Sequence, residues 1–188
     1  METLESGKSV DRNRAEGHPA LDLARKAHRG QLDRFGRDFI EHPAAVAELS
    51  VDLGDTARTV AYLHDTVEKA GTDPEEIERL FGREVRQMVE TLGQDPSIED
   101  GMARREDHRR RIAVAGRIEQ AIYLNDRRES ILTLTSLLES GRDPGEFDAA
   151  RRVTLWQGDL EAVDPEKVDP ALLSTIREEL QRLSSALD

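Results

Sequence analysis

An all-α fold is the class that the sequence predicts, on three observations. All seven prolines follow an Asp or a His, and proline directly after a capping residue is typical of a helix start. Apolar residues recur with the helical period of about 3.6 residues, as in the stretch from Arg117 to Ser140. No segment shows the alternation of apolar and polar residues that is typical of a strand.

Start signals, stop signals and periodicity place the helices along the chain. Prolines begin the helices expected at 19–31, 43–53, 74–81, 144–162 and 170–186. Asp73-Pro74 is the clearest start, because Glu76 lies three residues after Asp73 and completes a capping box. The helices expected at 43–53, 55–70, 83–92 and 117–140 end before Gly54, Gly71, Gly93 and Gly141, where a left-handed backbone suits glycine. Periodicity alone predicts the helix at 103–115.

The length of 188 residues suits a single domain. Residues 1–17 are polar and are expected to form a mobile N-terminal tail. The last two helices, within 141–188, are expected to pack on the same domain.

Composition and charge exclude several functions. The net charge of −12 opposes the phosphate contacts on which binding to a nucleic acid polymer depends. The chain has no cysteine, so any metal must be held by His, Asp or Glu. No apolar run is long enough to span a bilayer, and the first residues lack the apolar core of a signal peptide. A cytoplasmic protein that does not enter a membrane is therefore expected.

Two histidines and two aspartates are the candidate metal ligands. His64 and Asp65 follow an apolar stretch, where burying both would be costly unless a cation bound them. His42 precedes Pro43 at a helix start, and Asp126 interrupts the apolar face of the long helix. A mixed nitrogen and oxygen set suits Mn²⁺, Fe²⁺ or Zn²⁺. Spacing alone equally allows a chance dipeptide and an ordinary cap.

Four linked segments, in this order and spacing, resemble the HD-domain hydrolases of the RelA/SpoT type. The segments are Ala24-Arg-Lys-Ala-His28-Arg-Gly-Gln31, Phe35-Gly-Arg-Asp-Phe-Ile-Glu-His42-Pro43, Leu63-His64-Asp65-Thr-Val-Glu68 and Thr72-Asp-Pro-Glu-Glu-Ile-Glu-Arg-Leu-Phe81. The chain is most similar to the small alarmone hydrolases, which include the metazoan SpoT homologue. The resemblance covers about residues 20–140 and implies an HD-type hydrolase domain at 18–140.

The resemblance implies a helical bundle with one metal ion, normally manganese, and two extra helices at the C-terminal end. It also implies removal of the 3′-pyrophosphate of (p)ppGpp. The ligands that carry over are His42, His64, Asp65 and Asp126, the same set that the chemistry of the residues indicates.

Several positions depart from the family pattern. The family has a Glu-Asp pair where this chain has Glu68 and Lys69, and a basic pair where this chain has Asp33 and Arg34. On the long helix, a Lys, a base-contacting Asn and an Arg of the family are replaced by Tyr123, Ser130 and Leu132. The metal ligands therefore match the family better than the substrate contacts do.

The sequence predicts a metal-dependent phosphohydrolase that acts on a nucleotide or a related phosphate ester. Glu68 is expected to orient or deprotonate a water molecule, with Lys69 beside it. The expected substrate contacts are Arg34, Lys69, Arg127 and Ser130. Three alternatives stay open: a (p)ppGpp hydrolase with a rebuilt pocket, an HD phosphohydrolase for another substrate, and a degenerate HD domain that binds a nucleotide or a partner. Lys69 favours the third and the ligand set opposes it.

A basic cluster at residues 104–111 allows two interpretations. It could contact phosphates, or it could form the helical pairs Glu106/Arg110 and Asp107/Arg111 on a solvated face. We favour the solvated face. Trp156 and the apolar residues of the last helix are expected in the core.

Overall fold

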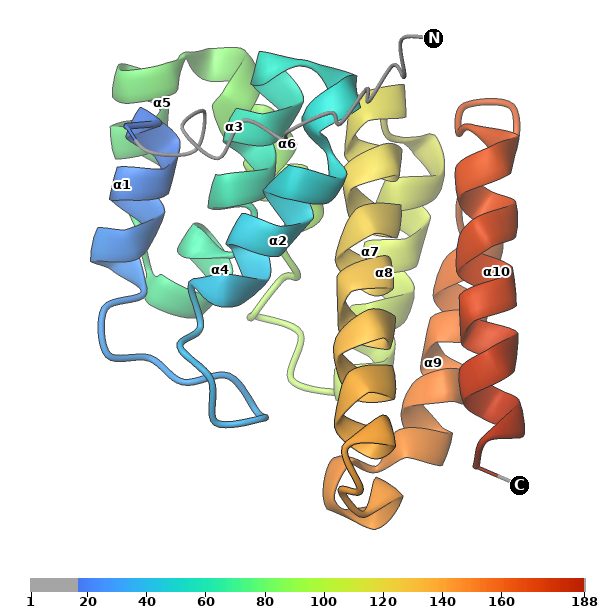
Figure 1. The fold of residues 1–188 in the computed structure, drawn as a ribbon. Coiled ribbons are helices and arrows are strands. Elements are labelled where there is room, and N and C mark those ends of the chain that lie inside the picture. The colour runs from blue at the N-terminus through green and yellow to red at the C-terminus, as the bar shows by residue number, and fades with distance from the viewer. Residues whose placement is uncertain (1–16, 188) are drawn as a thin grey trace, which may run out of the picture.

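The computed structural model describes residues 17–187, and the regular elements within this range are all helices, which confirms the predicted all-α class (Figure 1). The predicted tail lies outside the described residues, except for Gly17. The elements, in chain order, are α1 (Pro19–Ala27), α2 (Glu41–Leu49), the 3₁₀ helix η2 (Val51–Leu53), α3 (Asp55–Leu63), α4 (Thr66–Ala70), α5 (Pro74–Phe81), α6 (Arg83–Leu92), α7 (Gly101–Val114), α8 (Arg117–Glu139), the 3₁₀ helix η3 (Pro144–Phe147), α9 (Ala149–Glu161) and α10 (Pro170–Ser185).

The predicted helix starts hold for α1, α5 and α10, which each begin with a proline behind a capping side chain. The carboxylate of Asp73 accepts a hydrogen bond of 2.9 Å from the backbone N–H of Glu75. The prediction for α2 is wrong by two residues, because this helix begins at Glu41. His42 therefore lies in the first turn of α2 and not ahead of it. Pro43 tolerates this position because backbone N–H groups in a first turn have no helical partner.

The predicted helix at 55–70 is interrupted at His64 and Asp65, between α3 and α4. Side chains replace the helical backbone hydrogen bonds there. Nδ1 of His64 lies 2.8 Å from the carbonyl oxygen of Ala61, and the hydroxyl of Thr66 donates to the carbonyl oxygen of Leu63 at 2.7 Å. At this break His64 is buried and Asp65 is partly buried.

Two other predicted helices also differ from the structure. The helix expected at 19–31 ends at Ala27, and a loop leads from it to α2. The helix expected at 144–162 is divided at Asp148, whose φ of 51° ends η3 before α9 begins. Gly71 ends α4 in the expected left-handed conformation, whereas Gly93 follows α6 with an extended backbone.

The long helix α8 lies between two groups of helices. It contacts α2, α3 and α6 on one side and α7, α9 and α10 on the other. Its residues Ile122, Leu124, Ile131 and Leu134 are fully buried in the core. Helices α9 and α10 pack against each other and against α8, while the division of the chain into domains stays a prediction.

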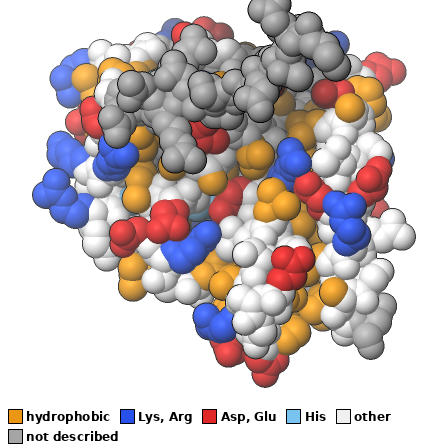
Figure 2. All heavy atoms as spheres, viewed as in Figure 1, with side chains coloured by type: hydrophobic (Ala, Val, Ile, Leu, Met, Phe, Trp, Pro, Cys, Tyr) orange, Lys and Arg blue, Asp and Glu red, His pale blue; other side chains and the backbone are white. Residues whose placement is uncertain are grey.

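The described surface is charged and mixed in sign. Figure 2 shows acidic and basic side chains interspersed over the face that it presents. Among the helices of residues 17–187, none combines the length and the hydropathy that crossing a bilayer would require.

Candidate metal centre

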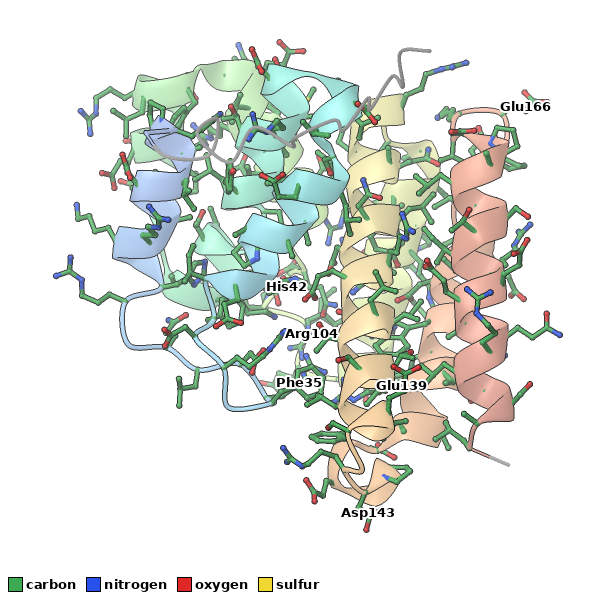
Figure 3. All side chains as sticks on the ribbon, viewed as in Figure 1. Phe35, His42, Arg104, Glu139, Asp143 and Glu166 are labelled. Atoms are coloured by element: carbon green, nitrogen blue, oxygen red, sulfur yellow. The ribbon has the colours of Figure 1, made fainter. Side chains whose placement is uncertain are left out.

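Four side chains from three parts of the fold converge beside α8. His42 comes from α2, His64 and Asp65 from the break between α3 and α4, and Asp126 from α8. Nε2 of His42 lies 3.2 Å from Oδ1 of Asp126 and 3.9 Å from Oδ2 of Asp65. Nε2 of His64 lies 3.6 Å from the same oxygen of Asp65. Figure 3 shows His42 at the lower end of α2.

The donor atoms of His42, His64 and Asp65 lie within 4.8 Å of one another. Nε2 of His64 is buried and has no hydrogen-bond partner among the described residues. A buried polar atom without a partner is costly, and a coordinated cation would satisfy it. The residues therefore fit a divalent metal ion with mixed nitrogen and oxygen ligands.

Glu129 orients His42 from the side opposite the candidate ligands. Its Oε2 lies 2.5 Å from Nδ1 of His42, and its Oε1 accepts a hydrogen bond of 2.8 Å from the hydroxyl of Thr133. Arg37 is 3.5 Å from the same Oε1. Sequence reasoning missed Glu129, although its place three residues after Asp126 puts both on one face of α8.

The electrostatics of the centre favour positive charge at His42. Burial lowers its pKa, but hydrogen bonds with Asp126 and Glu129 outweigh this and raise the pKa to about 10. Burial raises the pKa of Asp126, yet Arg127 and His42 hold it well below its usual range. A divalent cation would take the place of the proton that these carboxylates stabilise on His42.

A pocket of about 420 Å³ contains the candidate centre. All of the site residues predicted from the sequence line it, namely Arg34, His42, His64, Asp65, Glu68, Lys69, Asp126, Arg127 and Ser130. Residues of α7 and α9 complete the wall, and sequence reasoning missed their part in it. These are Arg105, His108, Arg152, Leu155 and Trp156.

Glu68 is held on both carboxylate oxygens. Its Oε2 accepts a hydrogen bond of 2.7 Å from the backbone N–H of Gln94, and its Oε1 forms an ion pair with Lys69. The side chain of Lys69 remains 42% exposed. The ammonium group of Lys69 therefore lies beside Glu68, the acid that the sequence predicts to orient or deprotonate water.

The departures from the family pattern differ in position. Asp33 lines the pocket, but its carboxylate accepts hydrogen bonds from the backbone of Phe35 and Arg37 and pairs with the guanidinium of Arg37. Ser130 lines the pocket, whereas Leu132 lies outside it and is 40% exposed.

The guanidinium of Arg127, an expected substrate contact, contacts three other side chains. It pairs with Asp126 at 3.2 Å and with Asp159 at 2.9 Å, and lies 4.6 Å from the centre of the Tyr123 ring.

The basic cluster on α7 is only partly the solvated face that the sequence predicts. Arg111 pairs with Asp107 at 3.0 Å as expected. The expected pair of Glu106 with Arg110 is replaced by pairs of Glu106 with Arg109 and of Asp107 with Arg110. Arg105 and Arg109 also reach across to Asp159 of α9, because α7 faces α9 and not only solvent.

Trp156 is buried as expected and also forms part of the pocket wall. In α10, the apolar residues Leu173, Ile176, Leu180 and Leu183 are buried, which confirms the predicted core positions; Leu172 is partly buried.

The fold and the centre define an HD-domain protein. The family model described as HD domain matches residues 20–132, and the chain belongs to this family. Within it, the chain is related to the SpoT-type ppGpp hydrolases.

Curated relatives with this similarity include three hydrolases. A guanosine-3′,5′-bis(diphosphate) 3′-pyrophosphohydrolase of Aquifex aeolicus is 32% identical over 65% of this chain and 18% of its own length. A human protein of the same name is 40% identical over 42% of this chain and 48% of its own. The bifunctional (p)ppGpp synthase/hydrolase SpoT of Escherichia coli is 37% identical over 36% of this chain and 10% of its own. The chain thus matches less than half of the length of each.

Solved structures support the fold. A metazoan orthologue of SpoT superposes with a TM-score of 0.74 at 21% identity, over 87% of this chain and 92% of that one. A Listeria monocytogenes protein superposes with a TM-score of 0.67 at 18% identity, over 78% of this chain and 97% of its own.

Proposed function

We propose that this protein is a metal-dependent phosphohydrolase for a nucleotide or a related phosphate ester, similar to the (p)ppGpp 3′-pyrophosphohydrolases. One observation carries the proposal. The buried Nε2 of His64, which has no partner among the described residues, faces a group completed by His42 and Asp65, with Asp126 beside them. These atoms lie in the wall of a pocket that also contains basic side chains.

The proposed ligands are His42, His64, Asp65 and Asp126. Mn²⁺ is the ion we propose, with Fe²⁺ or Zn²⁺ as alternatives, since all three accept imidazole and carboxylate ligands. A bound ion of this kind lowers the pKa of a water molecule and offsets charge on phosphoryl oxygens.

The remaining pocket residues have roles suited to a phosphorylated substrate. Lys69 and the exposed Arg34 supply positive charge for phosphate oxygens. Glu68 would orient or deprotonate the attacking water, which requires its Oε1 to exchange Lys69 for that water. Ser130 offers a hydroxyl to the substrate.

The size and the charge of the site favour a small substrate over a polymer. A pocket of about 420 Å³ lies within the range of about 300–1,000 Å³ that is usual for small-molecule sites. The net charge of −12 opposes binding to a nucleic acid polymer. A cytoplasmic location stays a prediction of the sequence.

A screen of purified protein tests the proposal. Manganese-loaded protein is incubated with ppGpp and with nucleoside mono-, di- and triphosphates, and released phosphate and pyrophosphate are measured. We expect turnover of at least one substrate, abolished by a chelator and by His64→Ala. Turnover that survives both treatments contradicts the proposed centre.

The ion pair between Lys69 and Glu68 favours a second candidate function. If the Glu68 carboxylate stays paired with Lys69, it cannot activate water. The domain would then bind a nucleotide without hydrolysing it, or bind a partner. This alternative predicts nucleotide binding in calorimetry without turnover of any phosphate in the same screen.

A further inference from the structure

Asp159 of α9 binds three arginines from two other helices. This carboxylate is fully buried and lies outside the segment that the family model matches. Its Oδ1 accepts hydrogen bonds of 2.9 Å from Nε of Arg105 and from Nε of Arg109, both on α7. Its Oδ2 lies 2.9 Å from Nε of Arg127 on α8. One carboxylate thus joins three helices.

Arg127 connects this cluster to the candidate metal centre. Its Nη1 lies 3.2 Å from Oδ2 of Asp126. The other oxygen of Asp126, Oδ1, lies 3.2 Å from Nε2 of His42. The two oxygens of this candidate ligand therefore have different neighbours, one held by Arg127 and the other facing the ligand group.

Gly158, next to Asp159 on α9, makes room for one of the three arginines. A Cβ atom at this position would lie 2.5 Å from Nη2 of Arg109. The same Nη2 donates a hydrogen bond of 2.8 Å to the carbonyl oxygen of Leu155. Glycine inside a helix is destabilising, and here it leaves room for the guanidinium that crosses α9 to reach Asp159.

We propose that Asp159 is a positioning residue of the metal centre, which acts through Arg127 to orient the carboxylate of Asp126. The proposal rests on the metal centre of the proposed function. It assigns part of that centre to α9, which lies beyond the residues that the family model matches.

Charge and geometry both predict that loss of Asp159 weakens metal binding. Without Asp159, the guanidinium of Arg127, which lies 3.2 Å from Asp126, would lack its buried counter-charge, which disfavours a divalent ion bound beside it. Arg127 would also lose the ion pair in which its Nε lies 2.9 Å from Oδ2 of Asp159, a contact without hydrogen-bond geometry, so its position beside Asp126 would be less restricted. Groups that orient metal ligands in this way typically contribute about 10–100-fold to metal affinity.

The chain contains a matched control at the next position of α8. Arg128 pairs with Glu179 of α10, with Nη2 at 2.9 Å from Oε1 and Nε at 3.0 Å from Oε2. This pair also joins α8 to a C-terminal helix through a largely buried carboxylate. Neither residue lines the pocket, so Glu179→Gln reports the cost of losing such a pair away from the centre.

Calorimetric titration of the metal-free full chain with Mn²⁺ tests the proposal. We expect Asp159→Asn to weaken Mn²⁺ binding about 10–100-fold, while Asp159→Glu retains most of the affinity and Glu179→Gln stays within about twofold of wild type. Equal losses in Asp159→Asn and Glu179→Gln would show a merely structural role and overturn the proposal. A wild-type chain that binds no Mn²⁺ would instead overturn the proposed function, and this inference with it.

A double-mutant cycle tests the route through Arg127. In an Arg127→Met background, Asp159→Asn should change Mn²⁺ affinity by no more than about twofold. A full loss in that background contradicts the route. If Asp159→Asn does not fold, the comparison of Arg127→Met with Arg128→Met decides the question, because only the first should weaken Mn²⁺ binding.

Discussion

Nδ1 of His42 lies 2.5 Å from Oε2 of Glu129, which is almost fully buried on α8. Burial raises the pKa of Glu129, but its hydrogen bond to His42 outweighs this and the pKa is lowered. An ionised carboxylate can only accept, so the proton sits on Nδ1 of the imidazole. Nε2 is then the atom available to a cation, between Asp65 and Asp126.

Replacing Glu129 should therefore weaken metal binding. We expect Glu129→Gln to lower Mn²⁺ affinity about 10–100-fold, because the amide no longer fixes the ring with a charged acceptor. Titration calorimetry measures the change. Thr133→Val is the control, since it removes a hydroxyl that contacts Arg37 and the other oxygen of Glu129 but leaves the contact of Glu129 with His42 in place. Equal affinities for Glu129→Gln and wild type would contradict the orienting role.

Purified protein should bind about one transition-metal ion per chain, since one set of His and Asp ligands converges. His64→Ala and Asp126→Ala should each lower the occupancy that elemental analysis measures after dialysis. Full occupancy in both variants would place the metal elsewhere.

The pair of Glu68 and Lys69 distinguishes an enzyme from a degenerate domain. Glu68→Gln should lower kcat by about 10²–10⁴-fold with metal still bound, the range for a positioned acid or base. Lys69→Ala should raise KM by removing a phosphate contact, and Lys69→Asp should shift activity toward pyrophosphate substrates. Steady-state kinetics with Mn²⁺ measure these effects. A fully active Glu68→Gln would remove Glu68 from the mechanism.

Hydrolysis of ppGpp should be weaker than that of another phosphate substrate. The carboxylate of Asp33 is bound to its own loop, and Ser130 stands where the family has a base-contacting Asn. A site with unpaired polar groups discriminates by orders of magnitude. Values of kcat/KM across a nucleotide panel check this, and ppGpp as the best substrate would be the opposite result.

Acid should destabilise the fold through His108, which lines the pocket and is buried. Burial, with Arg127 and Arg111 nearby, lowers its pKa to about 3, against about 6.5 in the unfolded chain. The folded state thus excludes a proton that the unfolded state binds, so stability falls as the pH drops below about 6.5.

His108→Phe should remove this sensitivity. Between pH 7 and pH 5, metal-free wild type should lose about 2 kcal/mol more of its free energy of unfolding than the variant does. Urea unfolding at the two pH values gives both numbers. Parallel losses would show that His108 is not held neutral.

Much of the fold could be predicted from local signals. Capping at Asp73 and the proline starts of α1, α5 and α10 depend on neighbouring residues, so the sequence contains their cause. The break at His64 could not be predicted, because it depends on a side chain taking the carbonyl of Ala61 from the backbone.

The candidate site could also be predicted only in part. Its ligand types follow from chemistry and from a family resemblance, and the pocket contains every residue so predicted. Asp159 and Glu129 escaped prediction because their partners lie on other helices. Asp159 is more than thirty residues from the nearest of its arginines, Arg127. Only the packing of α7, α8 and α9 brings such charges together.

Phosphate release by manganese-loaded wild type, with the chelated protein and His64→Ala measured in parallel, tests whether the protein is a metal-dependent phosphohydrolase. We expect turnover of at least one nucleotide or phosphate ester by the loaded wild type, and loss of that turnover in the other two samples. No turnover by a wild type shown to contain one Mn²⁺ per chain would contradict it and favour the degenerate binding domain.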